Sequence, residues 1–310
     1  MTFEVLILGS NSSIPVHGRH PTAQIVHHDE QYFLVDCGEG TQMRMAAFKV
    51  KRSKIQHIFI SHLHGDHYFG LIGLLTSYHL LQRQTPLHIY SPPGLEEIIN
   101  LQFRYSDTRL VFPLHFHVFS GQTMETLYES DTLTISTLPM QHRIPCCGFL
   151  FREKKGLKRL KPGVAERYRL PTPMIAQLRQ GKNVWWNDIE LKSEEVTTEP
   201  PPPATYAFFS DTRYDERLAE PIAGIDLLYH EATFLSGLEE RAALTHHSTA
   251  AQAALLAQKA GVKHLLLGHF GSRYPELEPL LNEAKAIFPH VQLALEGHRY
   301  AVRQPAPSLV

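Results

Sequence analysis

The stretch HIFISHLHGDH, residues 57–67, places three histidines and an aspartate directly behind a short apolar run. The apolar residues predict a buried strand, and the glycine of the motif permits a tight turn after it. While the chain stays extended, His62 and His64 are two residues apart and point to the same side. Asp66 and His67 follow the bend and can face a second point in space.

A mixture of imidazole and carboxylate groups suits Zn²⁺ and related borderline metals. Four potential ligands within six residues are too many for one ordinary ion, so the motif predicts two ions that share a cavity. The alternative is a set of solvated or hydrogen-bonded surface histidines. That alternative fits a lone histidine in a turn far better than it fits HxHxDH behind an apolar strand.

The composition limits the classes of protein to consider. The chain has 310 residues, of which 43% are hydrophobic, and a formal net charge of −1. It can bury one large core or two ordinary ones, and no global basic field indicates a nucleic-acid partner. No apolar stretch approaches the ~20 residues of a membrane span. The start MTFEVLILGS has no basic leader, and three cysteines do not make a disulfide framework, so we expect a cytoplasmic protein.

Apolar runs alternate with helical patterns along most of the chain, which predicts an α/β fold with helix-covered sheets. We expect strands at 3–8, 23–27, 32–36, 57–61, 87–90, 114–119, 133–138, 147–151, 205–209, 226–230 and 264–269. We expect helices at 40–48, 66–82, 93–101, 173–180, 248–260 and 275–287, with Ser248 or the residue before it near the N-cap of the helix at 248–260.

Residues 152–204 differ from the rest of the chain. They open with a basic run at 152–169, which has eight basic and two acidic residues, and they end in an acidic, proline-rich segment. We interpret 152–204 as an arm inserted into a single domain that spans 1–310.

Three further apolar runs each end in a lone polar residue that could complete a metal site: His142, Asp211 and His269. The ends of strands meet on one rim of an α/β sheet, where sites of this class are built. Each residue alone is a weak signal, and the position that they share behind strands strengthens all three.

The motifs HxHxDH, SDT at 210–212 and GHF at 268–270, with His142 between the first two, resemble the metallo-β-lactamase superfamily. DCGEGTQ at 36–42, HEATF at 230–234 and HSTA at 247–250 are similar to its ribonuclease Z family, whose members cut the 3′ trailer from tRNA precursors. The resemblance runs nearly from end to end. It implies a four-layer αββα sandwich with an inserted basic arm.

The resemblance also implies roles for individual residues. His62, His64 and His142 would bind one zinc ion, Asp66, His67 and His269 would bind the other, and Asp211 would bridge both. The catalytic residues would be Asp66, which would also handle the proton of the attacking water, and His247, the acid for the leaving group, which Glu231 would orient. Manganese or iron could occupy the same ligands. The family further implies a homodimer.

The basic run carries a local charge of +6 and can neutralise phosphates. A solvated, flexible loop is the alternative for such a run, but ribonuclease Z proteins carry a tRNA-binding arm in the matching place. We therefore expect substrate contacts from Lys154, Lys155, Lys158, Arg159 and Lys161. The loop PVHGRHP at 15–21 resembles one near the scissile site, which adds Arg19.

The leading hypothesis is a zinc-dependent endoribonuclease that leaves a 3′-hydroxyl on tRNA and a 5′-phosphomonoester on the trailer. A general metallo-phosphodiesterase for small diesters would share the metal core, but HEATF, HSTA and the basic arm argue against it. A non-catalytic RNA-binding protein would have no need of an acid at position 247.

Overall fold

A computed structural model describes residues 2–303 and divides them into two compact units. The first unit contains the residues up to 129, residues 135–151 and the residues from 204 onward, and the second contains 130–134 and 152–203. No helix within 2–303 has both the length and the apolar character that a bilayer-spanning helix needs.

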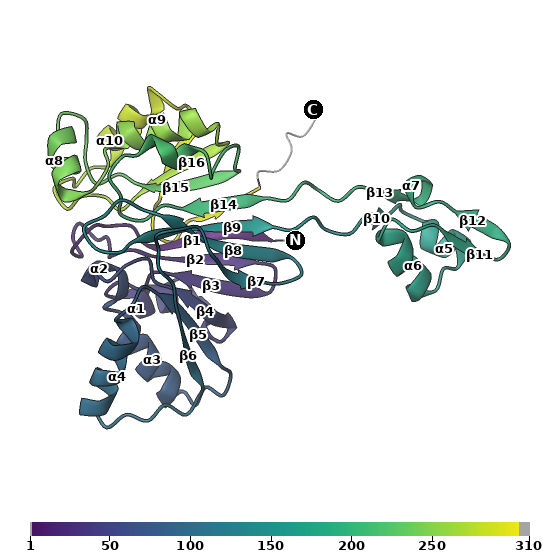
Figure 1. Cartoon of the computed structure of the whole chain (residues 1–310), viewed down its shortest axis with the longest axis horizontal. Coiled ribbons are helices and arrows are strands. Elements are labelled where there is room, and N and C mark those ends of the chain that lie inside the picture. Colours follow the sequence, from purple (N-terminus) through teal and green to yellow (C-terminus); the bar gives the residue numbers. More distant parts are fainter. Residues whose placement is uncertain (1, 304–310) are drawn as a thin grey trace. The chain divides into compact units, whose positions relative to one another are not determined.

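Two seven-stranded sheets form the centre of the first unit (Figure 1). The first sheet has the order β18-β1-β2-β3-β4-β5-β6, with bounds Arg299–Ala301, Phe3–Gly9, Ala23–His28, Gln31–Val35, Ile55–Phe59, Leu87–Ser91 and Leu114–Val118. The second has the order β17-β16-β15-β14-β9-β8-β7, with bounds Val291–Leu293, His264–Gly268, Leu227–Glu231, Thr205–Phe208, Cys147–Glu153, Leu133–Pro139 and Thr126–Glu129.

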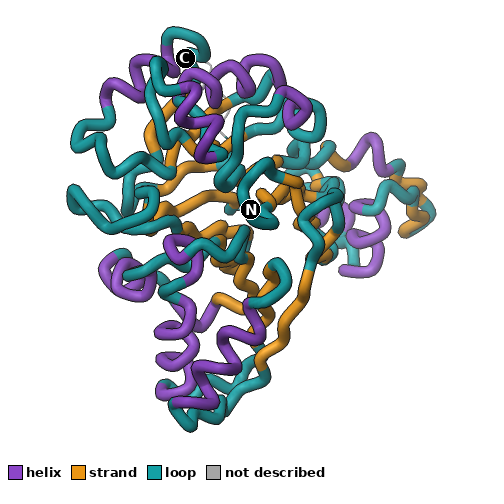
Figure 2. The backbone as a smooth tube through the Cα atoms, turned by 60° about the vertical axis from the view of Figure 1, so that its left-hand side comes forward, coloured by secondary structure: helices purple, strands orange, loops and turns teal. Residues whose placement is uncertain are grey.

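Helices cover the outer faces of both sheets (Figures 1 and 2). On the first sheet, α1 (Thr41–Ala47), α3 (Leu71–Leu80) and α4 (Leu95–Tyr105) bury residues such as Leu74 and Ile99 against Ile58 and Ile89. On the second sheet, the 3₁₀ helix η2 (Glu216–Ala219), α9 (Ala250–Ala260) and α10 (Glu278–Lys285) form a separate core. The predicted αββα sandwich is therefore confirmed. The remaining helices of the first unit are η1 (Arg52–Lys54), α2 (Gly65–Tyr68) and α8 (Glu239–Thr245).

Aromatic rings fill the layer between the two sheets. The rings of Phe59 and Tyr90 stack at 4.5 Å on the first sheet, and Phe149 of the second sheet meets Phe59 edge to face at 5.4 Å. Phe149 in turn stacks on Phe208 at 6.3 Å. Each such ring buries a large apolar area and adds a favourable ring–ring geometry, so this layer fixes how the sheets face each other.

Local sequence signals explain the ends of α9. The Thr249 side chain accepts the backbone N–H of Gln252, and the Gln252 side chain accepts the backbone N–H of Thr249, which makes a capping box. Gly261 ends the helix at φ 62°, a conformation that costs glycine little. The cap is Thr249, one residue later than predicted.

The single helix predicted over 66–82 is wrong, because two helices occupy this segment: α2, and α3 from Leu71. At the junction the backbone N–H of Gly70 bonds the carbonyl of Cys37 at 2.9 Å instead of continuing the helix. A Cβ on Gly70 would lie 2.2 Å from the carbonyl oxygen of Gly38. The close approach of the DCGEG loop therefore interrupts the helix. In the first unit the prediction also missed β7, β17, β18, α8 and the two 3₁₀ helices, and in the second unit it found only α6, because the apolar periodicity of the other elements is too short to stand out.

The second unit has a small core of its own, formed by Leu170, Leu178, Val184, Leu191 and Val196. Its elements are β10 (Arg159–Leu160), α5 (Val164–Tyr168), α6 (Thr172–Arg179), β11 (Val184–Trp186), β12 (Ile189–Leu191), α7 (Ser193–Val196) and β13 (Thr197–Thr198). The hairpin of β11 and β12 turns at Asn187 and Asp188, both at positive φ, as a type I′ turn requires.

We expect Phe59→Ala to lower the free energy of unfolding by about 3–5 kcal/mol, because it removes the ring that joins both sheets and leaves a cavity. Urea unfolding measures this change. Val118→Ala, at a side chain that is 57% exposed, serves as the control. A shift in the Phe59 variant no larger than that of the control would contradict the role of the aromatic layer.

Candidate metal centre

Seven candidate ligands meet where the strands of both sheets end. His62 and His64 follow β4, Asp66 and His67 lie in α2, and His142, Asp211 and His269 follow β8, β14 and β16. β14, β15 and β16 run parallel, so their carboxyl ends lie on one edge. The structure gathers the seven side chains into two groups, His62–His64–His142–Asp211 and Asp66–His67–His269, and a third group, Asp211–His247–His269, overlaps with both.

The first group gathers three imidazole nitrogens around one oxygen of Asp211, with all ligand atoms within 4.8 Å of one another. His62 Nε2 and His142 Nε2 each lie 3.0 Å from His64 Nδ1. Asp211 Oδ2 lies 3.6 Å from His62 Nε2 and 3.9 Å from His142 Nε2. Burial lowers the pKa of His142 to about 4, so this ring is neutral at pH 7, as a metal ligand must be.

The second group lies on the other oxygen of the same carboxylate. Asp211 Oδ1 is 3.4 Å from His67 Nε2 and 3.1 Å from His269 Nε2. Asp66 Oδ2 approaches the same two nitrogens at 3.6 and 3.5 Å. Asp211 therefore faces both groups, one with each oxygen.

The donor set fits divalent metal ions. Asp211 Oδ1 is buried and forms no hydrogen bond with any residue in the described part of the chain, although two imidazole nitrogens face it. A buried carboxylate oxygen in this state is costly, and a shared cation would satisfy it. Neutral imidazoles with carboxylates are the ligands that zinc prefers.

Partners behind the ligands hold their rings. His67 Nδ1 lies 2.7 Å from Asp36 Oδ2, and Ser61 donates its backbone N–H and its hydroxyl to the same carboxylate. His142 Nδ1 donates to the carbonyl of His246 at 3.0 Å, and His269 Nδ1 lies 3.0 Å from Thr233 Oγ1. No role was expected from the sequence for Asp36, Ser61 or Thr233. Asp36 lies in the DCGEG motif and Thr233 in the HEATF motif, so these motifs could have pointed to both residues.

His247 and Glu231 form a buried ion pair beside the cluster. His247 Nδ1 lies 2.9 Å from Glu231 Oε1, and the backbone N–H groups of Thr212 and Thr233 donate to the same carboxylate. Burial opposes charge on the ring, but the neighbouring carboxylates, chiefly Glu231, outweigh it and raise the pKa of His247 to about 9. The ring is therefore protonated near neutral pH, and its Nε2 remains free of Glu231.

A pocket opens beside the two groups. Its wall includes His64, Asp66, Asp211 and His247 from the cluster, and also Ile14, Phe69 and Arg143. The Phe69 ring is 61% exposed. An exposed ring and a guanidinium next to the cluster could contact a base and a phosphate.

Arg19 does not line this pocket. Its guanidinium donates to Asn11 Oδ1 at 3.0 Å and to the carbonyl groups of Tyr274 and Pro275. These bonds hold the loop at 15–21 against the segment after β16. The sequence did not indicate this structural role of Arg19.

The five arm residues predicted to bind substrate lie in the second unit. Lys155 and Lys158 pair with Glu199 at 3.1 and 3.0 Å, and Lys161 Nζ donates to the carbonyl of Glu195. Arg159 is exposed, and Lys154 is half-buried. Acidic side chains from the end of the segment thus offset part of the basic run.

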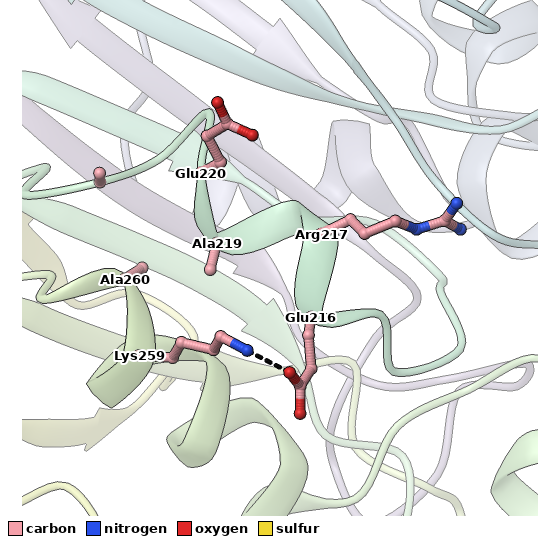
Figure 3. A pocket seen from close by; sticks show the side chains of 7 residues that line it. Glu216, Arg217, Ala219, Glu220, Lys259 and Ala260 are labelled. Atoms are coloured by element: carbon pink, nitrogen blue, oxygen red, sulfur yellow. Dashed lines mark hydrogen bonds and ion pairs between the residues drawn. The ribbon is translucent and has the colours of Figure 1, made fainter.

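A second pocket, between η2 and α9, has no comparable chemistry (Figure 3). Lys259 pairs with Glu216 across it, and Arg217 and Glu220 point away from that pair. The residues that line this pocket include no histidine or cysteine.

Comparisons with known proteins show the family to which the chain is related. Residues 3–157 match the family model described as Anti-Pycsar protein Apyc1. The chain is 45% identical to Ribonuclease Z of Cytophaga hutchinsonii over 305 residues, which cover 97% of each chain. It is 42% identical to Ribonuclease Z of Bacteroides fragilis (strain YCH46) over 296 residues, which cover 95% of this chain and 97% of the relative.

Solved structures share the fold. The short form of human tRNase Z superposes with a TM-score of 0.70 at 24% identity and covers 97% of this chain and 100% of its own. The metallo-β-lactamase fold protein YhfI from Bacillus subtilis gives 0.67 at 19% identity, with 96% and 98% covered. With curated relatives at these identities over nearly its whole length, the chain belongs to the ribonuclease Z family.

Proposed function

We propose that this protein is a zinc-dependent endoribonuclease that removes the 3′ trailer from tRNA precursors and leaves a 3′-hydroxyl on the tRNA. The observation that carries the proposal is the opening of the two ligand groups and the His247–Glu231 pair onto one pocket. Relatives named Ribonuclease Z at 42% and 45% identity support the same substrate class.

Two zinc ions are the proposed cofactors, although manganese or iron could accept the same donors. His62, His64 and His142 would hold one ion, Asp66, His67 and His269 would hold the second, and Asp211 would contact both. When bound, such a pair supplies an activated water near neutral pH and neutralises charge on the phosphodiester.

The protein's own residues would handle the protons. The water oxygen forms a bond to phosphorus while the bond from phosphorus to the 3′-oxygen of the tRNA breaks. His247 is held through Nδ1 by Glu231, so its Nε2–H can protonate that leaving oxygen. Asp66, held by the backbone N–H of Ser13 at 2.7 Å, can take the proton of the water.

Binding of the precursor would use both the pocket wall and the second unit. Arg143 can pair with a phosphate, and the exposed Phe69 ring can stack on a base near the cut. The basic residues of 152–169 would contact the tRNA body through its phosphates. The family also supports a cytoplasmic homodimer, whose mass can be tested by light scattering.

We expect Asp36→Asn to weaken zinc binding about 10–100-fold, because the carboxylate that orients His67 is replaced by a neutral amide of the same shape. Competition against a chelator of known affinity measures this constant. Asp215→Asn, which changes a carboxylate of a surface ion pair, is the control. Equal zinc affinity in the two variants would refute the orienting role of Asp36.

We expect His247→Ala to slow cleavage of a 3′-extended precursor about 10²–10⁴-fold, because the leaving oxygen loses its proton donor. The measurement uses metal-stripped, zinc-reloaded enzyme and an end-labelled precursor, with the cut mapped to the nucleotide. A 4-nitrophenyl diester, whose leaving group needs no proton, should be slowed far less.

His246→Asn is the neighbouring control, because it keeps the backbone carbonyl that accepts from His142 Nδ1 and tolerates the left-handed backbone at φ 58°. It removes the His246 ring, which lies 6.2 Å from that of His142. Equal losses on both substrates would contradict an acid role for His247. An intact precursor alongside a hydrolysed diester in the unsubstituted protein would favour the general phosphodiesterase instead.

We expect replacement of Lys158, Arg159 and Lys161 by Gln to weaken precursor binding and to flatten its salt dependence. Each lost phosphate contact removes about 0.9 from the slope of log K against log salt. Filter binding at several salt concentrations gives the slope. The same exchange at three exposed lysines of the first unit, Lys49, Lys51 and Lys285, is the control, and equal slopes in both triple variants would exclude the arm as the binding surface.

A further inference from the structure

Four histidines lie together on three neighbouring strands of the first sheet, away from the candidate metal centre. His57 of β4 pairs in register with His88 of β5, which pairs with His115 of β6, and His117 follows two residues later. Side chains two residues apart on a strand, and directly paired across strands, project from the same face. All four therefore point to the face opposite Ile58 and Ile89, which pack against the helices.

This face is the inner face of the sandwich, and the second sheet leaves part of it uncovered. The aromatic layer continues as far as Tyr128 of β7, whose ring meets His57 at 4.7 Å. Beyond that edge, at the strands β5 and β6 in Figure 1, His115 and His117 are exposed. The histidines thus occupy the place where the apolar inner face reaches solvent.

The nitrogen atoms are close enough to share an ion. His88 Nδ1 lies 2.9 Å from His117 Nε2. This separation matches the 3.0 Å between His62 Nε2 and His64 Nδ1 in the candidate metal centre. The ring of His115 stacks on His88 at 5.0 Å, which places a third imidazole beside this pair.

The protonation state suits ligation as well. Burial, with neighbouring histidines adding to it, lowers the pKa of His88 and of His117. Both rings are neutral at pH 7, which is the form that binds metal. His115-x-His117 on an extended strand also repeats the spacing of His62-x-His64.

We propose that His88, His115 and His117 form a second divalent transition-metal site, separate from the ribonuclease centre, on the uncovered edge of the first sheet. Imidazole ligands favour Zn²⁺, Ni²⁺ and Cu²⁺ over Mg²⁺ or Ca²⁺. Water completes the coordination shell, because the site is open to solvent. An ion held here joins β5 to β6 at the free edge of the sheet.

Equilibrium dialysis with Zn²⁺ alone tests the proposal on the full chain. The unsubstituted protein should bind about one more zinc ion per chain than the double variant His88→Gln/His117→Gln. The extra ion should bind more weakly than those of the catalytic centre, since no carboxylate is among its ligands. His115→Gln alone should lower the affinity for the extra ion about tenfold while the stoichiometry stays the same.

His264→Gln/His290→Gln is the matched control, because it removes another pair of neighbouring rings, 5.7 Å apart, elsewhere on the first unit. This control should retain the extra ion. The double variant at 88 and 117 should cleave precursor at the normal rate, which also shows that it is folded. Equal zinc stoichiometry in the unsubstituted protein, the double variant at 88 and 117 and the control, at every free zinc concentration, would overturn the site. His88 and His117 would then be a hydrogen-bonded pair of neutral histidines without a metal.

Discussion

One buried carboxylate, that of Asp211, is the constraint on which the rest of the site depends. Its two oxygens each face two imidazole nitrogens, at 3.1–3.9 Å, in a position with almost no access to water. A charge in such a place is tolerable only when cations or hydrogen bonds compensate it. The strands from which these side chains come must therefore end at one edge, and the aromatic layer between the sheets holds them there.

Hydrogen bonds from neighbouring groups also fix the rings of the candidate ligands. Asp36, Thr233 and the carbonyl of His246 each take the second nitrogen of one ligand histidine, so the ring orientation follows from hydrogen bonds. Thr233 also donates its hydroxyl to Glu231, which holds His247. The candidate ligand His269 and the proposed acid are thus connected through one hydroxyl, which belongs to the HEATF motif.

Two features add to the sheets and helices of the sandwich: the second unit, and the histidines on β5 and β6 at the edge of the first sheet. The segment 152–203 has its own small core, so it can carry a dense basic run without disturbing the main sheets. The edge at β5 and β6 replaces the large apolar rings of the interior by histidines, which stack like aromatic residues and still tolerate water. Both features place charge or polarity where burial is incomplete.

The sequence by itself predicted the helix-covered sheets and pointed to all seven candidate ligands, because apolar strands followed by lone polar residues are local signals, and the family resemblance specified the four-layer sandwich. The family resemblance also suggested roles for His247 and Glu231, and the structure places these two side chains 2.9 Å apart. The sequence could not reveal the helix break at Gly70, the hydrogen bonds from Arg19 to the backbone at 274–275, or the bond by which Asp36 orients His67. These depend on contacts between residues far apart in the chain, as does the gathering of His88, His115 and His117, which only the register of neighbouring strands decides. Strand pairing brings such residues close together in space, and no local pattern in the sequence encodes which strands pair.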